Sequence, residues 1–184
     1  MHPTAAPITF RPFTEADIPL LYKWFRRPHI IEWWGEDDAN LTLSETMDEY
    51  ALSKFSEYNT SPYIAMMDAQ PIGFAQSYIA FGASGGWWES ETDPGVRGID
   101  QFLAEESLLG RGVGTSLVST LTSMLFEDEN VTKIQTDPSP RNLRAIRCYE
   151  KAGFHKVGVI TTPDGQAMYM LKNRPTVIAA ASAA

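Results

Sequence analysis

The stretch Leu108-Leu109-Gly110-Arg111-Gly112-Val113-Gly114-Thr115 decides which fold this chain is expected to adopt. It leads into apolar residues at helical spacing, among them Leu117, Leu121 and Leu125, so the sequence predicts a loop that enters a helix. Glycines have no Cβ atom to keep a ligand off the backbone, and the first N–H groups of a helix have no partners inside it. With the helix dipole and Arg111, these donors suit an anion; a glycine-rich turn without a ligand is the alternative.

The run before this loop, residues 96–103, has the composition of a strand, which gives the local order strand, glycine-rich turn and helix. Phosphate groups bind well at such a junction. Two familiar phosphate loops are excluded, because the chain has neither Gly-x-Gly-x-x-Gly followed about 20 residues later by an acidic residue nor Gly-Lys-Ser/Thr closing the turn. The sequence therefore predicts a phosphate site of another kind.

Length and composition favour one domain, which we expect over residues 1–174, followed by an Ala-rich, flexible tail at 175–184. The single cysteine, Cys148, excludes an internal disulfide and a cysteine-based metal site, and we expect it to be a small core residue. Three scattered histidines predict no metal site either. No apolar run reaches the roughly 20 residues of a membrane span, and the N-terminus has no signal-peptide pattern. We therefore expect a cytoplasmic, bacterial protein with no membrane partner.

The net charge of −8 argues against a nucleic-acid partner and is compatible with a cationic one. Two acidic groups lie beside tryptophan pairs: residues 36–38 follow Trp33-Trp34, and Glu89, Glu91 and Asp93 follow Trp87-Trp88. Ordinary solvated faces are the alternative for these acids. The loop from Gly82 to Gly95 is long, aromatic and acidic, which is typical of a binding loop.

The rest of the chain alternates between strand and helix patterns. The strongest helix-start signal is Thr42 followed by Glu45, the spacing of a capping box, and Gly153 is placed to end the last helix. The predicted strands are 8–13, 62–67, 72–81, 96–103, 131–136, 155–162 and 167–171, and the predicted helices are 14–27, 42–55, 113–126 and 142–152.

Two motifs and this element order resemble the GCN5-related N-acetyltransferases (GNAT). Gly110-Arg111-Gly112-Val113-Gly114 is similar to their pyrophosphate loop, Gln/Arg-x-x-Gly-x-Gly/Ala, with Leu109 where Gln or Arg is usual. Residues 142–154 are similar to their Asn-x-x-Ala-x-x-x-Tyr-Glu-Lys-x-Gly-Phe helix. The resemblance implies an α/β (α+β) acyl-CoA N-acyltransferase fold, a mixed central sheet splayed between its fourth and fifth strands, with helices on both faces. It also implies acetyl-CoA as co-substrate and no metal.

The resemblance narrows to the aminoglycoside 6′-N-acetyltransferases at residues 33–35, 87–88, 92–101, 133–138 and 161–165, and it covers roughly residues 7–172. It implies transfer of the acetyl group of acetyl-CoA directly to the 6′-amine of an aminoglycoside, a polycationic small molecule, by a monomer or weak homodimer. Two other hypotheses stay open: an acetyltransferase for a protein N-terminus or a polyamine, and a non-enzymatic drug-binding module.

Site roles follow from the same resemblance. Asp100 is expected to act as the base for the reacting amine, Asp137 to orient that amine, and Tyr149 to protonate the departing thiolate. Trp24 is expected in the core. The expected acetyl-CoA contacts are Gln101, Phe102, Leu103, Leu109, Gly110, Arg111, Gly112, Val113, Gly114, Thr115, Asn142 and Tyr149. The expected drug contacts are Trp34, Trp87, Trp88, Asp100, Asp137 and Asp164.

Overall fold

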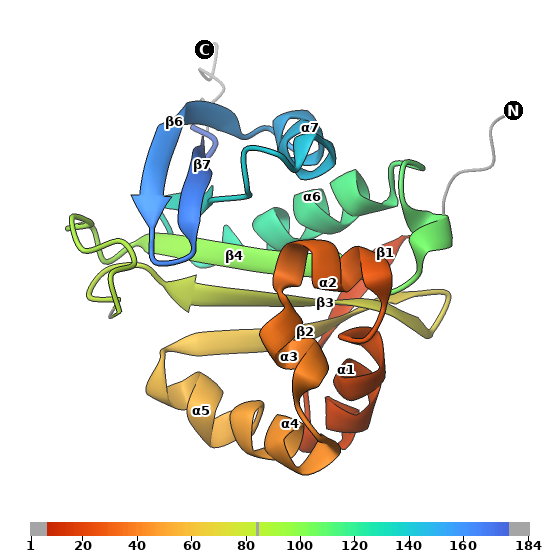
Figure 1. Cartoon of the computed structure of the whole chain (residues 1–184). Helices are drawn as coiled ribbons and strands as arrows, with labels where there is room; N and C mark the ends of the chain where they lie inside the picture. Colours follow the sequence, from red (N-terminus) through yellow and green to blue (C-terminus); the bar gives the residue numbers. More distant parts are fainter. Residues whose placement is uncertain (1–6, 84, 177–184) are drawn as a thin grey trace, which may run out of the picture.

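One mixed sheet runs through the computed structural model, which describes residues 7–83 and 85–176 (Figure 1). Within these residues the sheet has seven strands in the order β1-β2-β3-β4-β5-β7-β6. All neighbouring strands are antiparallel except the pair β4 and β5. The strands are β1 (Ile8–Pro12), β2 (Thr60–Met67), β3 (Gln70–Ile79), β4 (Val96–Leu103), β5 (Lys133–Thr136), β6 (His155–Thr162) and β7 (Gly165–Asn173).

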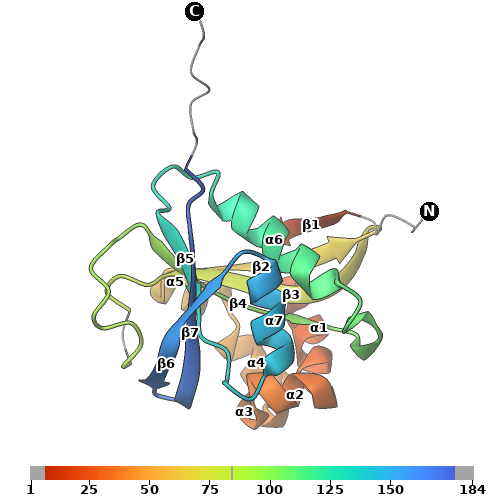
Figure 2. The ribbon, with the colours of Figure 1, turned by 90° about the horizontal axis from the view of Figure 1, so that it is seen from above.

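Helices cover both faces of the sheet, as predicted. On one face lie α6 (Val113–Leu125) and α7 (Leu143–Lys151), which cross the strands in Figure 2. On the other face lie α1 (Ile18–Trp24), α2 (Pro28–Trp34), α3 (Glu36–Asn40), α4 (Leu43–Glu49) and α5 (Leu52–Glu57). Two short 3₁₀ turns, η1 (Glu15–Asp17) and η2 (Glu106–Leu108), complete the described elements.

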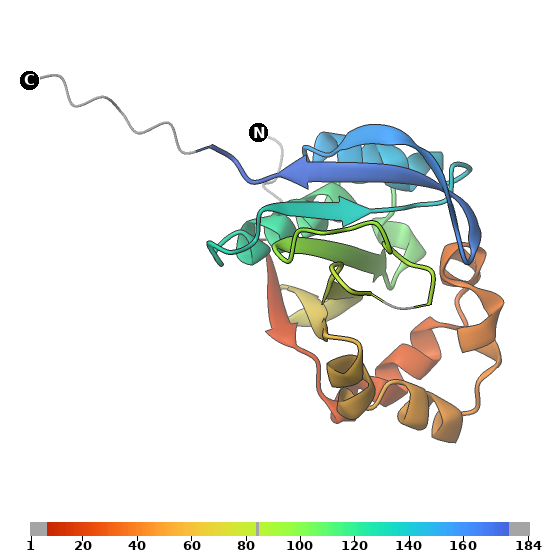
Figure 3. The ribbon, with the colours of Figure 1, turned by 90° about the vertical axis from the view of Figure 1, so that its left-hand side faces the viewer.

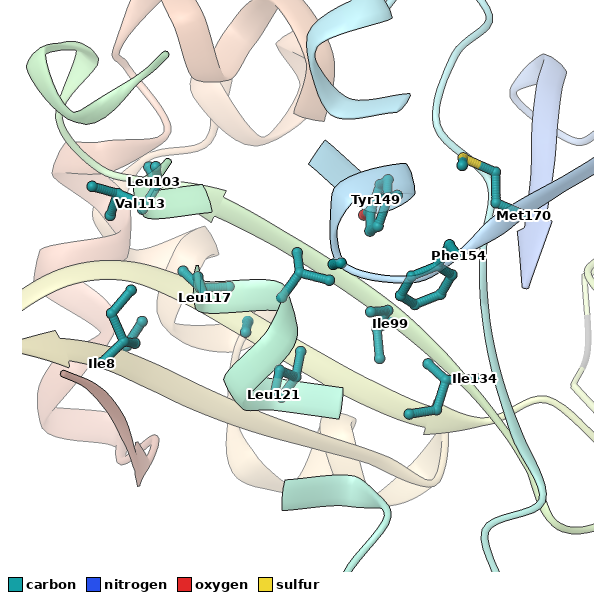
Figure 4. Packing of buried hydrophobic residues seen from close by; sticks show 14 of the residues in the cluster. Ile8, Ile99, Leu103, Val113, Leu117, Leu121, Ile134, Tyr149, Phe154 and Met170 are labelled. Carbon is teal, nitrogen blue, oxygen red and sulfur yellow. The ribbon is translucent and has the colours of Figure 1, made fainter. Parts of the chain in front are cut away.

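Each face has its own hydrophobic core. Between the sheet and α6 and α7, Ile99, Leu117, Leu121 and Ile134 are all fully buried (Figure 4). The opposite core is strongly aromatic; it contains Ile18, Trp24, Phe25, Phe55 and Phe74. The side chains of β4 alternate between the two cores, so this strand contributes to both of them.

The predicted splay between the fourth and fifth strands is confirmed. β4 and β5 pair only at Val96–Lys133, Arg97–Ile134 and Gly98–Gln135, although β4 continues to Leu103. β5 ends at Thr136 because Asp137 and Pro138 turn the chain away, and a proline has no N–H to continue the ladder. The second half of β4 therefore has an open edge toward α7.

The main departures from the predicted elements lie before β2. The segment 28–40 is helical, because Pro28 sets the first helical residue of α2 after an extended Arg27, and Gly35 at φ +128° separates α2 from α3. The predicted helix 42–55 is broken into α4 and α5 by extended backbone at Ala51. Its capping box is confirmed: Thr42 Oγ1 accepts from the Glu45 N–H at 3.3 Å, and Glu45 Oε2 accepts from the Thr42 N–H at 2.7 Å.

The predicted domain over residues 1–174 contains every described element, from β1 to the end of β7. Residues 1–6 of that domain and 177–184 of the predicted tail lie outside the described residues. The boundary at residue 174 stays a prediction. In the part of the chain that the structure describes, no helix combines the length and apolar character that a membrane span needs.

Candidate active site

The glycine-rich loop has the geometry that an anion site needs. Gly110 and Gly112 have φ values of +70° and +84°, a conformation that glycine adopts without strain, and an added Cβ at either would meet nothing within 4 Å. α6 begins at Val113, and the first bond back into this turn is from the Ser116 N–H to the Gly112 carbonyl. The N–H groups of residues 113–115 are therefore free to face a ligand, beside the exposed Arg111.

The remaining loop residues pack rather than point outward. Leu109 is partly buried against the α6 side of the sheet, so this position, where relatives by resemblance carry Gln or Arg, contributes apolar packing. Val113 is buried, so only its backbone can reach a ligand. A Cβ at Gly114 would lie 3.4 Å from Cys148 Sγ, and the Thr115 hydroxyl lies 3.7 Å from the same sulfur. Gly114 thus lets α6 approach α7 closely, and Cys148 is a partly buried packing residue, as predicted.

The open edge of β4 is lined by odd-numbered residues. The Ala80 N–H bonds to Val96 and the Ala104 N–H to Ile72, so the even-numbered residues of β4 direct their backbone groups toward β3. Gln101 and Leu103 consequently direct theirs into the splay, where the Leu103 carbonyl lies 3.0 Å from His29 Nε2.

This alternation leaves Phe102 out of the splay. Its backbone faces β3, and its ring packs on Trp24, Phe25, Trp34 and Phe74 at centroid distances of 5.0–6.0 Å. Phe102 also lines the large cavity described below, and its expected contact with acetyl-CoA stays a prediction. Leu103 is buried in the opposite core, which leaves only its backbone for a ligand.

Two expected site residues of α7 meet the splay. The Tyr149 side chain is 5% exposed, and its hydroxyl accepts a hydrogen bond from Gln101 Nε2 at 2.8 Å. Asn142 is the N-cap of α7, and its Oδ1 accepts from the Ala145 N–H at 3.0 Å. Both residues also line the large cavity described next.

A cavity of about 1120 Å³ opens at the splay, and its lining includes residues of α2 as well as residues of α7. Its described lining holds a single basic side chain, Arg141, against six carboxylates. The six are Glu32, Asp37, Glu57, Asp100, Asp137 and Asp164. Such a lining attracts a polycation and repels anions.

Asp100 and Asp137 face this cavity from the two parting strands. Gln76 Nε2 donates to Asp100 Oδ2 at 2.9 Å. Burial raises the pKa of Asp100, against the opposing effect of that hydrogen bond. Burial, followed by the charges of Asp100 and the exposed Asp164, raises the pKa of Asp137 to about 7. A carboxyl group that titrates near neutral pH inside a cavity is a candidate for proton transfer.

The tryptophans divide between two sites. Trp87 lines the large cavity, as predicted, and Trp24 lies in the core at 3% exposure, also as predicted. Trp34 lines the cavity and packs in the aromatic core, with its ring 5.0 Å from that of Phe102. Trp88 does not line the large cavity: its indole donates to the Tyr78 hydroxyl at 2.9 Å and lines a smaller cavity of about 250 Å³, and its expected drug contact stays a prediction.

Among the residues that the sequence did not indicate, Glu32, Glu57 and Tyr78 line the cavity and Gln76 donates to Asp100. The available signal for Tyr78 was a glycine inside a strand, because Gly98 indicates a close approach by another group. No sequence pattern around Glu32 or Glu57 could have indicated them, because they reach the cavity only through the way in which α2 and α5 pack on the sheet.

The splayed sheet, the glycine-rich loop at residues 110–114 and the carboxylates Asp100 and Asp137 suit an N-acetyltransferase site, and the family model described as "Acetyltransferase (GNAT) domain" matches residues 14–162. The chain is 58% identical over 167 residues to aminoglycoside N(6′)-acetyltransferase type 1 of Klebsiella pneumoniae, which covers 91% of this chain and 83% of that protein. It is 69% identical over 90 residues to a kanamycin resistance protein of Rhizobium radiobacter, across 49% of this chain and 83% of that protein.

A solved structure agrees with these sequence matches. The crystal structure of aminoglycoside acetyltransferase AAC(6′)-Ib in complex with coenzyme A and kanamycin has a TM-score of 0.86 at 57% identity, covering 91% of this chain and 95% of the other. The chain therefore belongs to the aminoglycoside N(6′)-acetyltransferases of the GNAT family.

Proposed function

We infer that this protein is an acetyl-CoA-dependent aminoglycoside 6′-N-acetyltransferase, which transfers an acetyl group directly to the 6′-amine of the antibiotic and thereby confers resistance. The observation that carries the inference is the position of Asp100 and Asp137 on opposite sides of the point where β4 and β5 part, inside an acidic cavity. The likeness to acetyltransferases solved with coenzyme A and aminoglycosides supports it.

The acidic cavity selects the substrate class. An aminoglycoside carries several ammonium groups, and the six carboxylates of the cavity lining attract such a polycation. Trp87 offers an indole face to sugar C–H groups and to ammonium groups, worth ~0.5–2 kcal/mol for each such contact.

The other side of the splay fits acetyl-CoA. The open cradle at Gly110 and Gly112 and the free N–H groups at the start of α6 suit a diphosphate, and Gln101 and Leu103 offer backbone groups to the pantetheine arm, with Asn142 nearby. When bound, acetyl-CoA supplies the acetyl group as a thioester. We propose that a backbone N–H of β4 donates to the thioester carbonyl oxygen.

Asp100 is proposed to remove the proton that the ammonium group must lose before it can attack. Gln76 engages Asp100 Oδ2, which fixes the carboxylate and leaves Oδ1 for the amine. Asp137, with a pKa raised to about 7 by burial, sits across the splay and orients the same amine. After burial, the charge of Asp100 is the next largest cause that raises the pKa of Asp137.

Tyr149 is proposed to protonate the departing thiolate, and the second proton that the attacking nitrogen loses on becoming an amide restores the phenol. Burial raises its pKa, so the phenol keeps its proton throughout the working pH range. Gln101 donates to the phenol oxygen at 2.8 Å, which orients the hydroxyl and leaves its proton for another acceptor. The phenol is a weaker acid than the thiol that it would form, because a thiol has the lower reference pKa. The phenol can therefore act only through a hydrogen bond that its position provides.

The biological setting is the last part of the proposal. The net charge of −8 supports a protein that does not bind nucleic acid. We propose that it acts in the bacterial cytoplasm as a monomer or weak homodimer, with a single domain over residues 1–174.

A thiol-release assay tests the function. Purified protein with acetyl-CoA and kanamycin is expected to release free thiol, whereas drugs with a hydroxyl in place of the 6′-amine should give no turnover. Asp100→Asn is expected to abolish turnover and keep coenzyme A affinity, measured by calorimetry. No thiol above background would refute the proposal, as would an acetylated peptide or polyamine beside unmodified drug in mass spectrometry.

A further inference from the structure

Tyr78 lies next to the point where β4 and β5 part. It lies on β3 opposite Gly98, and Gly98 forms the last pair between β4 and β5. A Cβ built on Gly98 would lie 2.1 Å from Tyr78 Cζ and 2.5 Å from its hydroxyl oxygen. The phenol therefore lies flat across β4 at the strand fork, just before Asp100 on the same face of the strand, and it lines the large cavity.

Trp88 fixes this phenol from the other side. Its indole N–H donates to the Tyr78 hydroxyl at 2.9 Å, and its ring packs on Tyr169 with centroids 5.4 Å apart. Trp88 has φ +54°, a left-handed conformation that is uncommon for a bulky residue and persists only where tertiary contacts hold it. The connection between β3 and β4 thus reaches across to the β6–β7 hairpin, as Figure 3 shows, with Gly86 close to Pro163.

The indole determines where the Tyr78 proton can point. An indole N–H is a donor only, so the phenol oxygen must act as its acceptor and cannot direct its own proton toward Trp88. The proton is left to face the cavity that Asp100 and Asp137 also line. Burial and those two charges raise the pKa of Tyr78, so the phenol remains a donor near neutral pH.

We propose that Tyr78 is a substrate-positioning residue that donates a hydrogen bond to a sugar oxygen next to the reacting amine, and that Trp88 aims this hydroxyl. The inference rests on the proposed function and extends it to a third polar group. Ionised carboxylates can only accept hydrogen bonds, from the ammonium or the hydroxyl groups of the drug, whereas a phenol can donate one to a hydroxyl or ether oxygen. Tyr78 would therefore set the orientation of the ring that carries the amine.

The experiment compares Tyr78→Phe, Trp88→Phe and the double variant. Tyr63→Phe is the matched control, because Tyr63 lies on β2 against Phe10 and does not line the cavity. Thiol release with kanamycin and acetyl-CoA gives kcat and both KM values, calorimetry gives kanamycin affinity, and thermal unfolding reports stability.

Loss of one neutral hydrogen bond predicts that Tyr78→Phe lowers kcat/KM for kanamycin about fivefold to tenfold, with the acetyl-CoA KM unchanged. Trp88→Phe should cause a smaller loss, and the double variant should match Tyr78→Phe within about twofold, because Trp88 acts through Tyr78. The inference would be overturned if the losses in kcat/KM of the two single variants multiplied in the double variant. It would also be overturned if Tyr78→Phe and Tyr63→Phe had equal drug kinetics, or if the variants changed only in thermal stability. Wild-type protein without turnover would instead refute the proposed function.

Discussion

Replacing Asp137 with asparagine should make the protein more stable and less active, with a stability gain that depends on pH. Burial raises the pKa of Asp137 from 3.8 to about 7, so the folded state favours the protonated form. The stability contributed by this group is fully present below the unfolded-state pKa and is lost as the pH rises through about 7. An asparagine side chain cannot ionise, so the variant escapes that loss.

The magnitude follows from the same shift. Each unit of pKa corresponds to about 1.36 kcal/mol, so the raised pKa of Asp137 corresponds to an upper bound of roughly 4 kcal/mol in the free energy of unfolding. The free energy of unfolding of Asp137→Asn should therefore exceed that of the wild type by about 2–4 kcal/mol at pH 8 and by close to zero at pH 4. In a domain of this size that gap equals roughly 5–15 °C in Tm. The variant should also lose kcat/KM for kanamycin, because a cavity carboxylate is gone.

Urea unfolding at both pH values, with thiol release in parallel, checks this prediction. Asp93→Asn is the control of opposite sign, because the Thr132 hydroxyl and the Gly95 N–H hold the pKa of Asp93 below its ordinary value. That variant should lose stability at pH 8 and lose less in acid. If the stability difference between Asp137→Asn and the wild type were equal at pH 4 and pH 8, the reasoning would be refuted.

Three further variants probe the fork, the proton donor and the anion loop. Gly98→Ala should cost about 1–3 kcal/mol in urea unfolding, because the new methyl group displaces the Tyr78 ring, and unchanged stability would contradict this. Tyr149→Phe should lower kcat about 10²-fold or more in the thiol-release assay with little change in the acetyl-CoA KM; a raised KM at normal kcat would show that the hydroxyl only binds. Gly112→Ala, at φ +84°, should cost about 1 kcal/mol and weaken coenzyme A binding in calorimetry more than kanamycin binding, and the reverse ranking would exclude the loop as the anion site.

Local sequence patterns predicted most of the backbone. The glycine-rich entry to α6, the capping box at Thr42 and the cap at Asn142 are all set by residues a few positions apart, because N–H groups at a helix start need nearby acceptors or a ligand. The helices within residues 28–40 were not predicted at all, and the break at Ala51 was not visible because it interrupts an otherwise acceptable helical pattern.

What the tertiary structure alone decided is the direction of side chains at the fork. Two adjacent tryptophans looked equivalent in sequence, yet Trp87 faces the large cavity while Trp88 packs on Tyr169, far along the chain. Likewise the pKa of Asp137 depends on burial by distant segments. Sequence thus determined the helices and strands that local periodicity and caps specify, and the family resemblance of two motifs gave the fold class and the identity of the candidate acids. Which groups share a cavity, and how they titrate there, depends on contacts between strands that the chain order does not reveal.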